Sequence, residues 1–195
     1  IIMTYGIGNL FLRDEKSWLA GTHSESMKVT ALMFGLDLEN VSLTLPRLPC
    51  EGETDGITAL AEYCRDCFAD YDSERMKRLI KKKMQLGEIY IISHKDKTVG
   101  FVIFSKKNKT LDYIAVSSDY RNSGIASRLM VTAMAQFDIG DELSIVTFRD
   151  DHPQSDGAKR LYGKFGFGNP KNIVVQGIPL TKITAIIPDK ALTTE

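Results

Sequence analysis

The stretch from Arg121 to Ala126 places a fixed positive charge and several small residues at the start of a predicted helix. Backbone N–H groups in the first turn of a helix have no partner inside it, and the helix dipole favours an anion beside them. Gly124 has no side chain where a phosphate would approach, and Ala126 keeps the next inward position small. The candidate phosphate-binding residues are therefore Arg121, Asn122, Ser123, Gly124, Ile125 and Ala126.

This loop fits neither of two familiar nucleotide-binding motifs. A P-loop needs a longer glycine spacing and a lysine followed by Ser or Thr, and a dinucleotide fingerprint needs three glycines in a βαβ unit. Both patterns are absent from "RNSGIA". On the loop alone, phosphate binding and a glycine that merely eases a turn remain alternatives.

The pair Cys64-x-x-Cys67 is the other pattern that suggests chemistry, either at a metal or by redox. A zinc site needs four ligands, and the remaining Cys and His residues of the chain have no ligand-like spacing. Both cysteines also fall on the apolar stripe of a predicted helix. The pair therefore predicts core packing, and no metal site is expected.

The elements that must position these residues can be recognised by their periodicity. Alternating or apolar runs predict strands, and apolar residues three or four apart predict helices. The expected elements are a strand at 41–45, helices at 54–71 and 73–86 with Ser73 as N-cap, strands at 88–93, 98–104 and 111–118, a helix at 125–137, a strand at 143–148, a helix at 158–165 and one or two strands within 173–187. This order predicts an α/β domain of the α+β type, with one mixed, largely antiparallel twisted sheet flanked by helices.

The chain divides into two parts by the clarity of these patterns. Residues 1–40 are only weakly helical and are expected to form an N-terminal extension packed on the domain, which spans residues 41–195. No chemistry is assigned to the extension.

The composition narrows the class of protein. With 25 basic and 25 acidic residues the chain is neutral, which argues against nucleic acid or an anionic membrane as the main partner. No apolar run is long enough to cross a bilayer, and the first residues lack the pattern of a secretory signal. An odd number of cysteines, 3, suits a reducing compartment, so a cytoplasmic location is expected.

Two motifs in this order resemble the GNAT superfamily of acetyl-CoA-dependent N-acyltransferases. Arg-x-x-Gly-x-Ala after a strand is similar to the family's motif A and is matched by Arg121, Gly124 and Ala126. "SDGAKRLYGKFGF" resembles the family's later helix, with Ala158, Leu161, Tyr162, Gly166 and Phe167 in register. The element order from about residue 41 to 187 also matches, so the resemblance covers most of the chain.

The resemblance implies acetyl-CoA as cosubstrate, with its pyrophosphate on the N–H groups of 121–126. The pantetheine would pair with the strand backbone at Ile114, Ala115 and Val116, where an N–H would polarise the thioester carbonyl. Tyr162 would protonate the departing thiolate. Ser155 stands where the family usually has Asn, which shortens any hydrogen bond toward the pantetheine.

The function implied is N-acetyltransferase activity, by direct attack of a primary amine on acetyl-CoA in a ternary complex. A catalytically weak acyl-CoA sensor, or a structural module with this fold, is the alternative. The general base is open among Asp112, Glu88 and His152. A homodimer also stays open.

The acceptor, a small-molecule or peptide amine, is the least defined part. Four acids surround Phe68 and Tyr71 near the turn between the first two helices, and a carboxylate-rich wall with aromatics would attract a cationic amine. These acids are Asp66, Asp70, Asp72 and Glu74. The alternative is that they only cap and solubilise helix ends.

Overall fold

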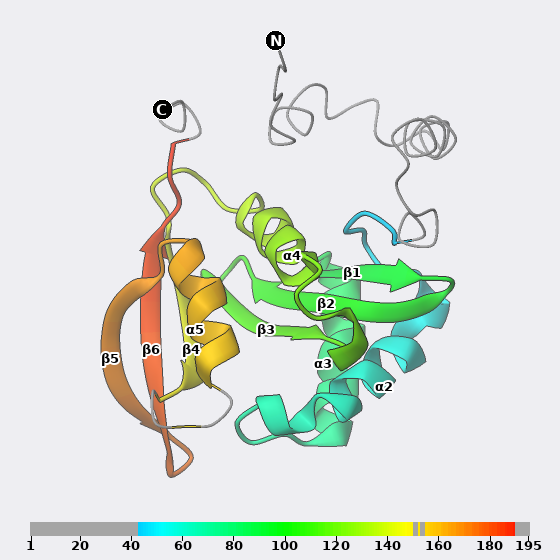
Figure 1. Cartoon of the computed structure of the whole chain (residues 1–195), viewed down its shortest axis with the longest axis horizontal. Coiled ribbons are helices and arrows are strands. Elements are labelled where there is room, and N and C mark those ends of the chain that lie inside the picture. The colour runs from blue at the N-terminus through cyan, green and yellow to red at the C-terminus, as the bar shows by residue number, and fades with distance from the viewer. Residues whose placement is uncertain (1–42, 150–151, 153–154, 190–195) are drawn as a thin grey trace. The chain divides into compact units, whose positions relative to one another are not determined.

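The computed structural model describes residues 43–149, 152 and 155–189, so the predicted extension at 1–40 lies outside the described residues. The sheet has six strands in the order β1-β2-β3-β4-β6-β5 (Figure 1). The elements, in chain order, are η4 (Glu51–Glu53), α2 (Thr54–Tyr63), η5 (Arg65–Cys67), α3 (Ser73–Leu86), β1 (Ile89–His94), β2 (Lys97–Ser105), β3 (Thr110–Val116), η6 (Ser118–Tyr120), α4 (Ile125–Met134), β4 (Glu142–Phe148), α5 (Ser155–Lys164), β5 (Gly168–Val175) and β6 (Ile178–Ile186).

The pairing of the strands confirms the predicted fold class. β1 with β2, β2 with β3, β4 with β6 and β5 with β6 are antiparallel, whereas β3 and β4 are parallel. The parallel pair joins the two antiparallel halves, and α4 forms the crossover between them. The sheet is therefore mixed and largely antiparallel, as the order of periodic segments predicts.

Hydrophobic cores lie on both faces of the sheet. α2 and α3 contribute Ile57 and Ile80 to a core that includes Phe101 of β2. α4 contributes Leu129 to the other core, with Val102 of β2, and α5 packs there too. Alternate residues of β2 thus point to opposite cores, as the pleat of a strand requires.

Gly100 on β2 sets how closely α4 approaches the sheet. A Cβ atom there would lie 2.7 Å from Cγ2 of Ile125 and 3.2 Å from Cδ1 of Leu129. Only glycine leaves room for both side chains at this distance. The first turn of α4 therefore sits directly on β2.

Two expectations about the helices need correction. The first helix ends at Tyr63 rather than near residue 71, because the chain passes through η5 and becomes extended at Phe68 (φ −116°, ψ 129°). In this conformation the Phe68 ring packs edge-on against Tyr113, with ring centroids 5.2 Å apart. α3 is capped by Asp72 rather than Ser73, since the Asp72 carboxylate accepts the N–H of Arg75 at 2.6 Å.

The expected strand at 41–45 is present only as isolated bridges along the edge of β1. Leu43 pairs with His94, and Arg47 pairs with Ile91. We call residues 43–47 the edge segment. Two of its N–H groups donate to β1 carbonyl oxygens: Thr44 to Ser93 at 2.8 Å and Arg47 to Ile91 at 3.0 Å.

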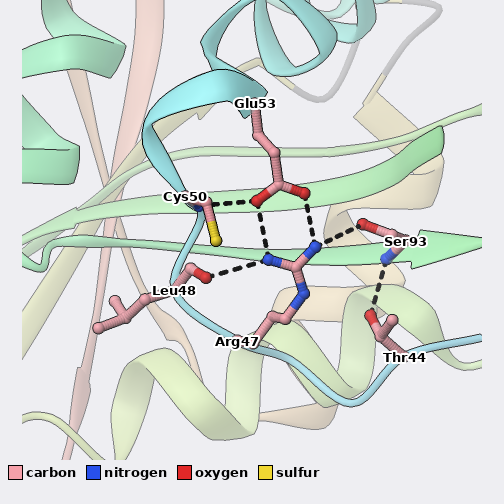
Figure 2. A network of polar contacts seen from close by, with 6 residues as sticks. All are labelled: Thr44, Arg47, Leu48, Cys50, Glu53 and Ser93. Carbon is pink, nitrogen blue, oxygen red and sulfur yellow. Dashed lines mark hydrogen bonds and ion pairs between the residues drawn. The ribbon is translucent and has the colours of Figure 1, made fainter. Parts of the chain in front are cut away.

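An ion pair holds the turn between the edge segment and α2 (Figure 2). The Arg47 guanidinium donates to both carboxylate oxygens of Glu53, at 2.8 and 2.5 Å, and the Cys50 N–H donates to the same carboxylate at 2.7 Å. This hydrogen bond raises the pKa of Arg47 and lowers the pKa of Glu53. Because both side chains are partly exposed, the pair stabilises the fold by no more than about 1 kcal/mol.

Candidate active site

β3 and β4 pair over only a short part of their length. Their partners are Thr110 with Ser144 and Leu111 with Ile145, after which the strands separate (Figure 1). A cavity of about 980 Å³ occupies the region where they part, lined by residues 112–116 of β3 and 146–148 of β4. Unpaired strand backbone along such a wall can hydrogen-bond an extended ligand.

The cavity brings most of the predicted site residues together. Those that line it are Ile114, Ala115, Val116, Arg121, Asn122, Gly124, Ile125, Ala126 and Tyr162. Ser123 and Ser155 are absent from its wall. Ser123 points back into its own loop, where its hydroxyl donates to the Tyr120 carbonyl at 2.5 Å. Ser155 is the first residue of α5 and is almost fully buried.

The loop before α4 offers a run of backbone donors. Asn122 and Gly124 both have positive φ, at 61° and 80°, and α4 begins at Ile125. The first helical bond is from the Arg128 N–H to the Gly124 carbonyl at 3.0 Å. Among the described residues, the N–H groups of 122–127 make no hydrogen bond to other backbone groups. This is the arrangement that binds phosphate at a helix N-terminus.

The Arg121 side chain lies beside the end of β3. Its Nε is 3.4 Å from the Val116 carbonyl oxygen, and its Nη2 is 3.9 Å from the Cys67 sulfur. The guanidinium therefore adds positive charge where the loop meets the separated strand edge.

Tyr162 lies on α5 and lines the cavity. The residue is 9% exposed, and its ring packs edge-on against Phe167 at 6.1 Å. Burial raises the pKa of Tyr162 to about 12. Because its hydroxyl stays protonated at neutral pH, Tyr162 can act as an acid but not as a base.

This buried phenol has a consequence for stability at high pH. An unfolded tyrosine ionises near pH 10, so between pH 10 and about 12 the unfolded chain releases a proton that the folded chain keeps. Wild-type protein should lose about 1.4 kcal/mol from this source by pH 11, and Tyr162→Phe should not lose that share. Urea unfolding of both proteins at pH 9 and pH 11 measures the difference. Equal losses in the two proteins would contradict the buried, protonated state.

Residues 85–168 match the family model described as an acetyltransferase (GNAT) domain. The matched stretch includes β3, residues 121–126 with their backbone donors, which we call the donor loop, and α5, which carries Tyr162. Over residues 85–168, the chain is therefore similar to the GNAT acetyltransferase family. No match to the chain was found among curated proteins.

Solved structures share this fold at low identity. Ard1 from Thermoplasma volcanium has a TM-score of 0.61 and 17% identity, covering 76% of this chain and 99% of its own. The yncA structure from Salmonella typhimurium, which holds acetyl-CoA, has a TM-score of 0.58 and 12% identity, with 78% and 98% covered. Naa50 from Arabidopsis thaliana, in complex with the bisubstrate analogue CoA-Ac-MVNAL, has a TM-score of 0.56 and 16% identity, with 74% and 98% covered.

Two of the three candidate bases are absent from the cavity wall. His152 stacks on Phe148, with ring centroids 3.8 Å apart. Glu88 is buried next to Lys83, whose Nζ is 2.9 Å from its carboxylate. Burial raises the pKa of Glu88, but hydrogen bonds from Lys83 and the Lys106 N–H outweigh it, and the net shift is downward. Of the three, Asp112 alone lines the cavity.

The four acids of the expected carboxylate wall are not brought together. Asp72 caps α3, and Asp70 forms an ion pair with Arg75 at 2.9 Å. Asp70 lines the cavity, whereas Asp66 and Glu74 do not. This placement favours the alternative, in which these acids serve the helix ends.

Apolar side chains line the cavity beside these polar groups. Phe68 and Tyr113 form one side, and Val175 and Ile178 line the cavity from the β5–β6 hairpin. The hairpin turn, Gln176–Gly177, has positive φ at both residues, 51° and 81°, as a tight two-residue turn requires. Sequence reasoning placed Phe68 at the acceptor site but missed Tyr113 and the hairpin residues, although Gln-Gly between two apolar runs is a readable turn signal.

The two cysteines have different surroundings. Cys64 belongs to the core between α2, α3 and the sheet, as expected, and burial raises the pKa of its thiol. Cys67 is half-buried and lines the cavity, whereas sequence reasoning placed it in the core.

Within the described residues, no helix has the length and apolarity that crossing a bilayer requires.

Proposed function

We propose that this domain is a GNAT N-acetyltransferase that moves an acetyl group from acetyl-CoA to a primary amine in a ternary complex. The observation that carries the proposal is the junction of an unpaired β3 edge with the run of donor N–H groups before α4. One binds an extended amide chain and the other binds phosphate. Acetyl-CoA has an extended chain with amide groups, the pantetheine arm, followed by a pyrophosphate.

The donor loop fits the pyrophosphate of acetyl-CoA. A Cβ at Gly124 would have no neighbour within 4 Å, so the space over the helix N-terminus is open. The N–H groups of 122–126 would bind the phosphate oxygens, and Arg121 adds a positive charge at the edge of the loop. Ser123 would contribute through its N–H alone.

The strand edge fits the pantetheine arm and the thioester. Backbone groups of Ile114, Ala115 and Val116 would pair with the amides of the arm, and an N–H of this strand would stabilise negative charge on the thioester oxygen. Ser155 is buried at the start of α5, so a contact with the arm would need its backbone or a small local movement.

The chemical step needs one bond to form and one to break. The neutral amine attacks the acetyl carbon, the new N–C bond forms, and the C–S bond breaks. Tyr162 would donate its proton to the departing sulfur, and the amine proton would leave to Asp112 or to water.

The solved relatives support this class of acceptor and cosubstrate. The Salmonella typhimurium structure holds acetyl-CoA, and the Naa50 structure holds an analogue that joins CoA to an acetylated peptide. We therefore propose a peptide or small-molecule amine as acceptor, with an apolar group near the amine to match Phe68 and Val175. A weak acyl-CoA sensor remains the second candidate, favoured only by the absence of a defined base.

The cellular setting follows the same reasoning. The three cysteines form no disulfide, which suits the reducing cytoplasm we propose. The neutral net charge argues against nucleic acid and membrane surfaces as partners. A homodimer is a further proposal, which the mass of the protein in solution tests.

The direct test is release of free CoA thiol from acetyl-CoA with a panel of peptide and small-molecule amines. Acetylated amine should appear by mass spectrometry in a one-to-one ratio with the thiol. Tight binding of acetyl-CoA by calorimetry, with no amine acetylated, would support the sensor instead. Absence of any acetyl-CoA binding would end both proposals.

A second prediction concerns the cations of α5. Arg160 and Lys164 are exposed and line the cavity, so they can attract the phosphates of acetyl-CoA. Replacing both by Gln should weaken acetyl-CoA binding about threefold to tenfold, because exposed charges interact weakly. The effect should shrink at high salt. Calorimetry at two salt concentrations measures it, with Lys159→Gln, which is on the same helix but outside the cavity wall, as control.

A further inference from the structure

Lys83 is a buried cation on the last turn of α3 and is only 5% exposed. Its Nζ lies 2.9 Å from Glu88, which precedes β1, and 3.1 Å from Asp112 on β3. It also donates a hydrogen bond to the Phe104 carbonyl of β2. A buried ammonium is tolerated only when it is paired and hydrogen-bonded. Lys83 therefore connects α3 to β2, to β3 and to the residue that precedes β1.

Asp112 is the extra residue of a β-bulge. Ile103 and Phe104 are adjacent on β2, yet they pair with Tyr113 and Leu111 on β3, which leaves Asp112 without a partner residue. On both sides of Asp112, successive side chains of β3 point to opposite faces of the sheet. Leu111 and Ile114 pack in the core under α4, and Tyr113 packs in the core under α2 and α3. Without Asp112, β3 would be a regular strand with every side chain on its present face.

Both oxygens of the Asp112 carboxylate are held. Oδ1 accepts the Thr110 hydroxyl at 2.6 Å, and Oδ2 contacts Lys83. The bulged conformation is therefore fixed by a contact within β3 and by a contact from α3. Glu88 is held in turn by the residue that follows β2, since its Oε1 accepts the Lys106 N–H at 2.8 Å.

The bulge coincides with the point where β3 leaves β4. The last pair between these strands is Leu111 with Ile145, immediately before Asp112. A bulge bends its strand and increases the local twist, which ends regular pairing. The separated region, residues 112–116, is the wall of the cavity on the β3 side.

We propose that Lys83 is a positioning residue that holds Asp112 in the bulge and thereby keeps the edge of β3 apart from β4. Its use in acetyl transfer rests on the proposed function. Lys83 does not line the cavity and touches no ligand there; it acts through Asp112. Without Lys83, the Asp112 carboxylate is held only by Thr110, and residues 112–116 can then pair with β4.

The test uses a variant that removes the cation without leaving Glu88 as an unpaired buried charge. Lys83→Met combined with Glu88→Gln removes a buried ion pair as a unit, which is often tolerated in stability. The matched control is Lys109→Met with Asp141→Asn. That ion pair, at 2.6 Å, lies at the other end of the β3–β4 contact and does not touch the bulge.

Two readouts are needed, hydrogen exchange of the backbone amides and acetyl-CoA affinity by calorimetry. In the Lys83 variant, exchange of the peptide covering 112–116 should slow, because strand pairing protects amides, and acetyl-CoA should bind at least tenfold more weakly. A general loss of stability cannot produce slower exchange. The control variant should match wild type in both measurements.

Three outcomes would overturn the inference. They are wild-type exchange and affinity in a folded Lys83 variant, faster exchange throughout the domain, and the same changes in the control variant. If the Lys83 variant does not fold, deletion of Asp112 gives the same comparison, since it removes the bulge itself. If wild-type protein binds no acetyl-CoA, the proposed function fails, and the exchange comparison still decides the role of Lys83.

Discussion

Gly124→Asp should weaken acetyl-CoA binding at least tenfold more than Gly124→Asn. Gly124 has a φ of 80°, in the left-handed region, and caps α4 where we propose the pyrophosphate to lie. Asn and Asp are the non-glycine residues that best tolerate this conformation, and they have the same shape. Both variants therefore carry the same backbone cost and bulk, and they differ by one negative charge.

The size of the effect follows from Coulomb's law. Two unit charges 4 Å apart near a protein surface repel by about 4 kcal/mol, so a tenfold difference, about 1.4 kcal/mol, is a cautious expectation. Calorimetric titration of both variants with acetyl-CoA measures it, after circular dichroism has shown that both are folded. Equal affinities for the Asp and Asn variants would mean that no phosphate lies against this turn.

Tyr162→Phe should lower the turnover number by about tenfold to a thousandfold with little change in acetyl-CoA affinity. The hydroxyl would act on the departing sulfur, which carries charge only as the C–S bond breaks. Because the pKa of Tyr162 is raised to about 12, the hydroxyl stays protonated through the neutral range. The loss should therefore be a constant factor from pH 6 to pH 9.

The control for this variant is Tyr90→Phe. Tyr90 is a partly buried tyrosine packed against the same core, stacked on Phe104 at 6.0 Å, and it is absent from the cavity wall. Single-turnover kinetics separates the chemical step from product release. Full chemical rate in Tyr162→Phe, or an equal loss in Tyr90→Phe, would exclude the role of proton donor.

The donor loop was predictable from the sequence because its chemistry is local. Arg121, Gly124 and Ala126 are close in the chain, and the helix that follows fixes where their N–H groups point. The fold class was predictable for a similar reason, since each strand and helix carries its own periodicity. Tyr162 was brought in by the resemblance rather than by its own surroundings.

The acceptor end of the cavity was not predictable in the same way. It is assembled from η5, β3 and a C-terminal hairpin, which are far apart in the sequence. The sequence predicts a carboxylate-rich wall of the acceptor site from four acids near one turn. In the structure, Asp72 instead caps α3, and Asp70 forms an ion pair with Arg75. The bulge at Asp112 could not be predicted from the sequence either. One extra residue does not change the apolar pattern of a short strand enough to be recognised.

The edge segment has a consequence for any shortened form of this chain. Its pairing with β1 covers backbone groups that would otherwise form an exposed strand edge, and the Arg47–Glu53 ion pair anchors it to the turn before α2. A truncated protein that began after Arg47 would present β1 as a bare template for a strand of another molecule. Such a protein should self-associate on concentration, so truncations intended for crystallisation need to start before Leu43.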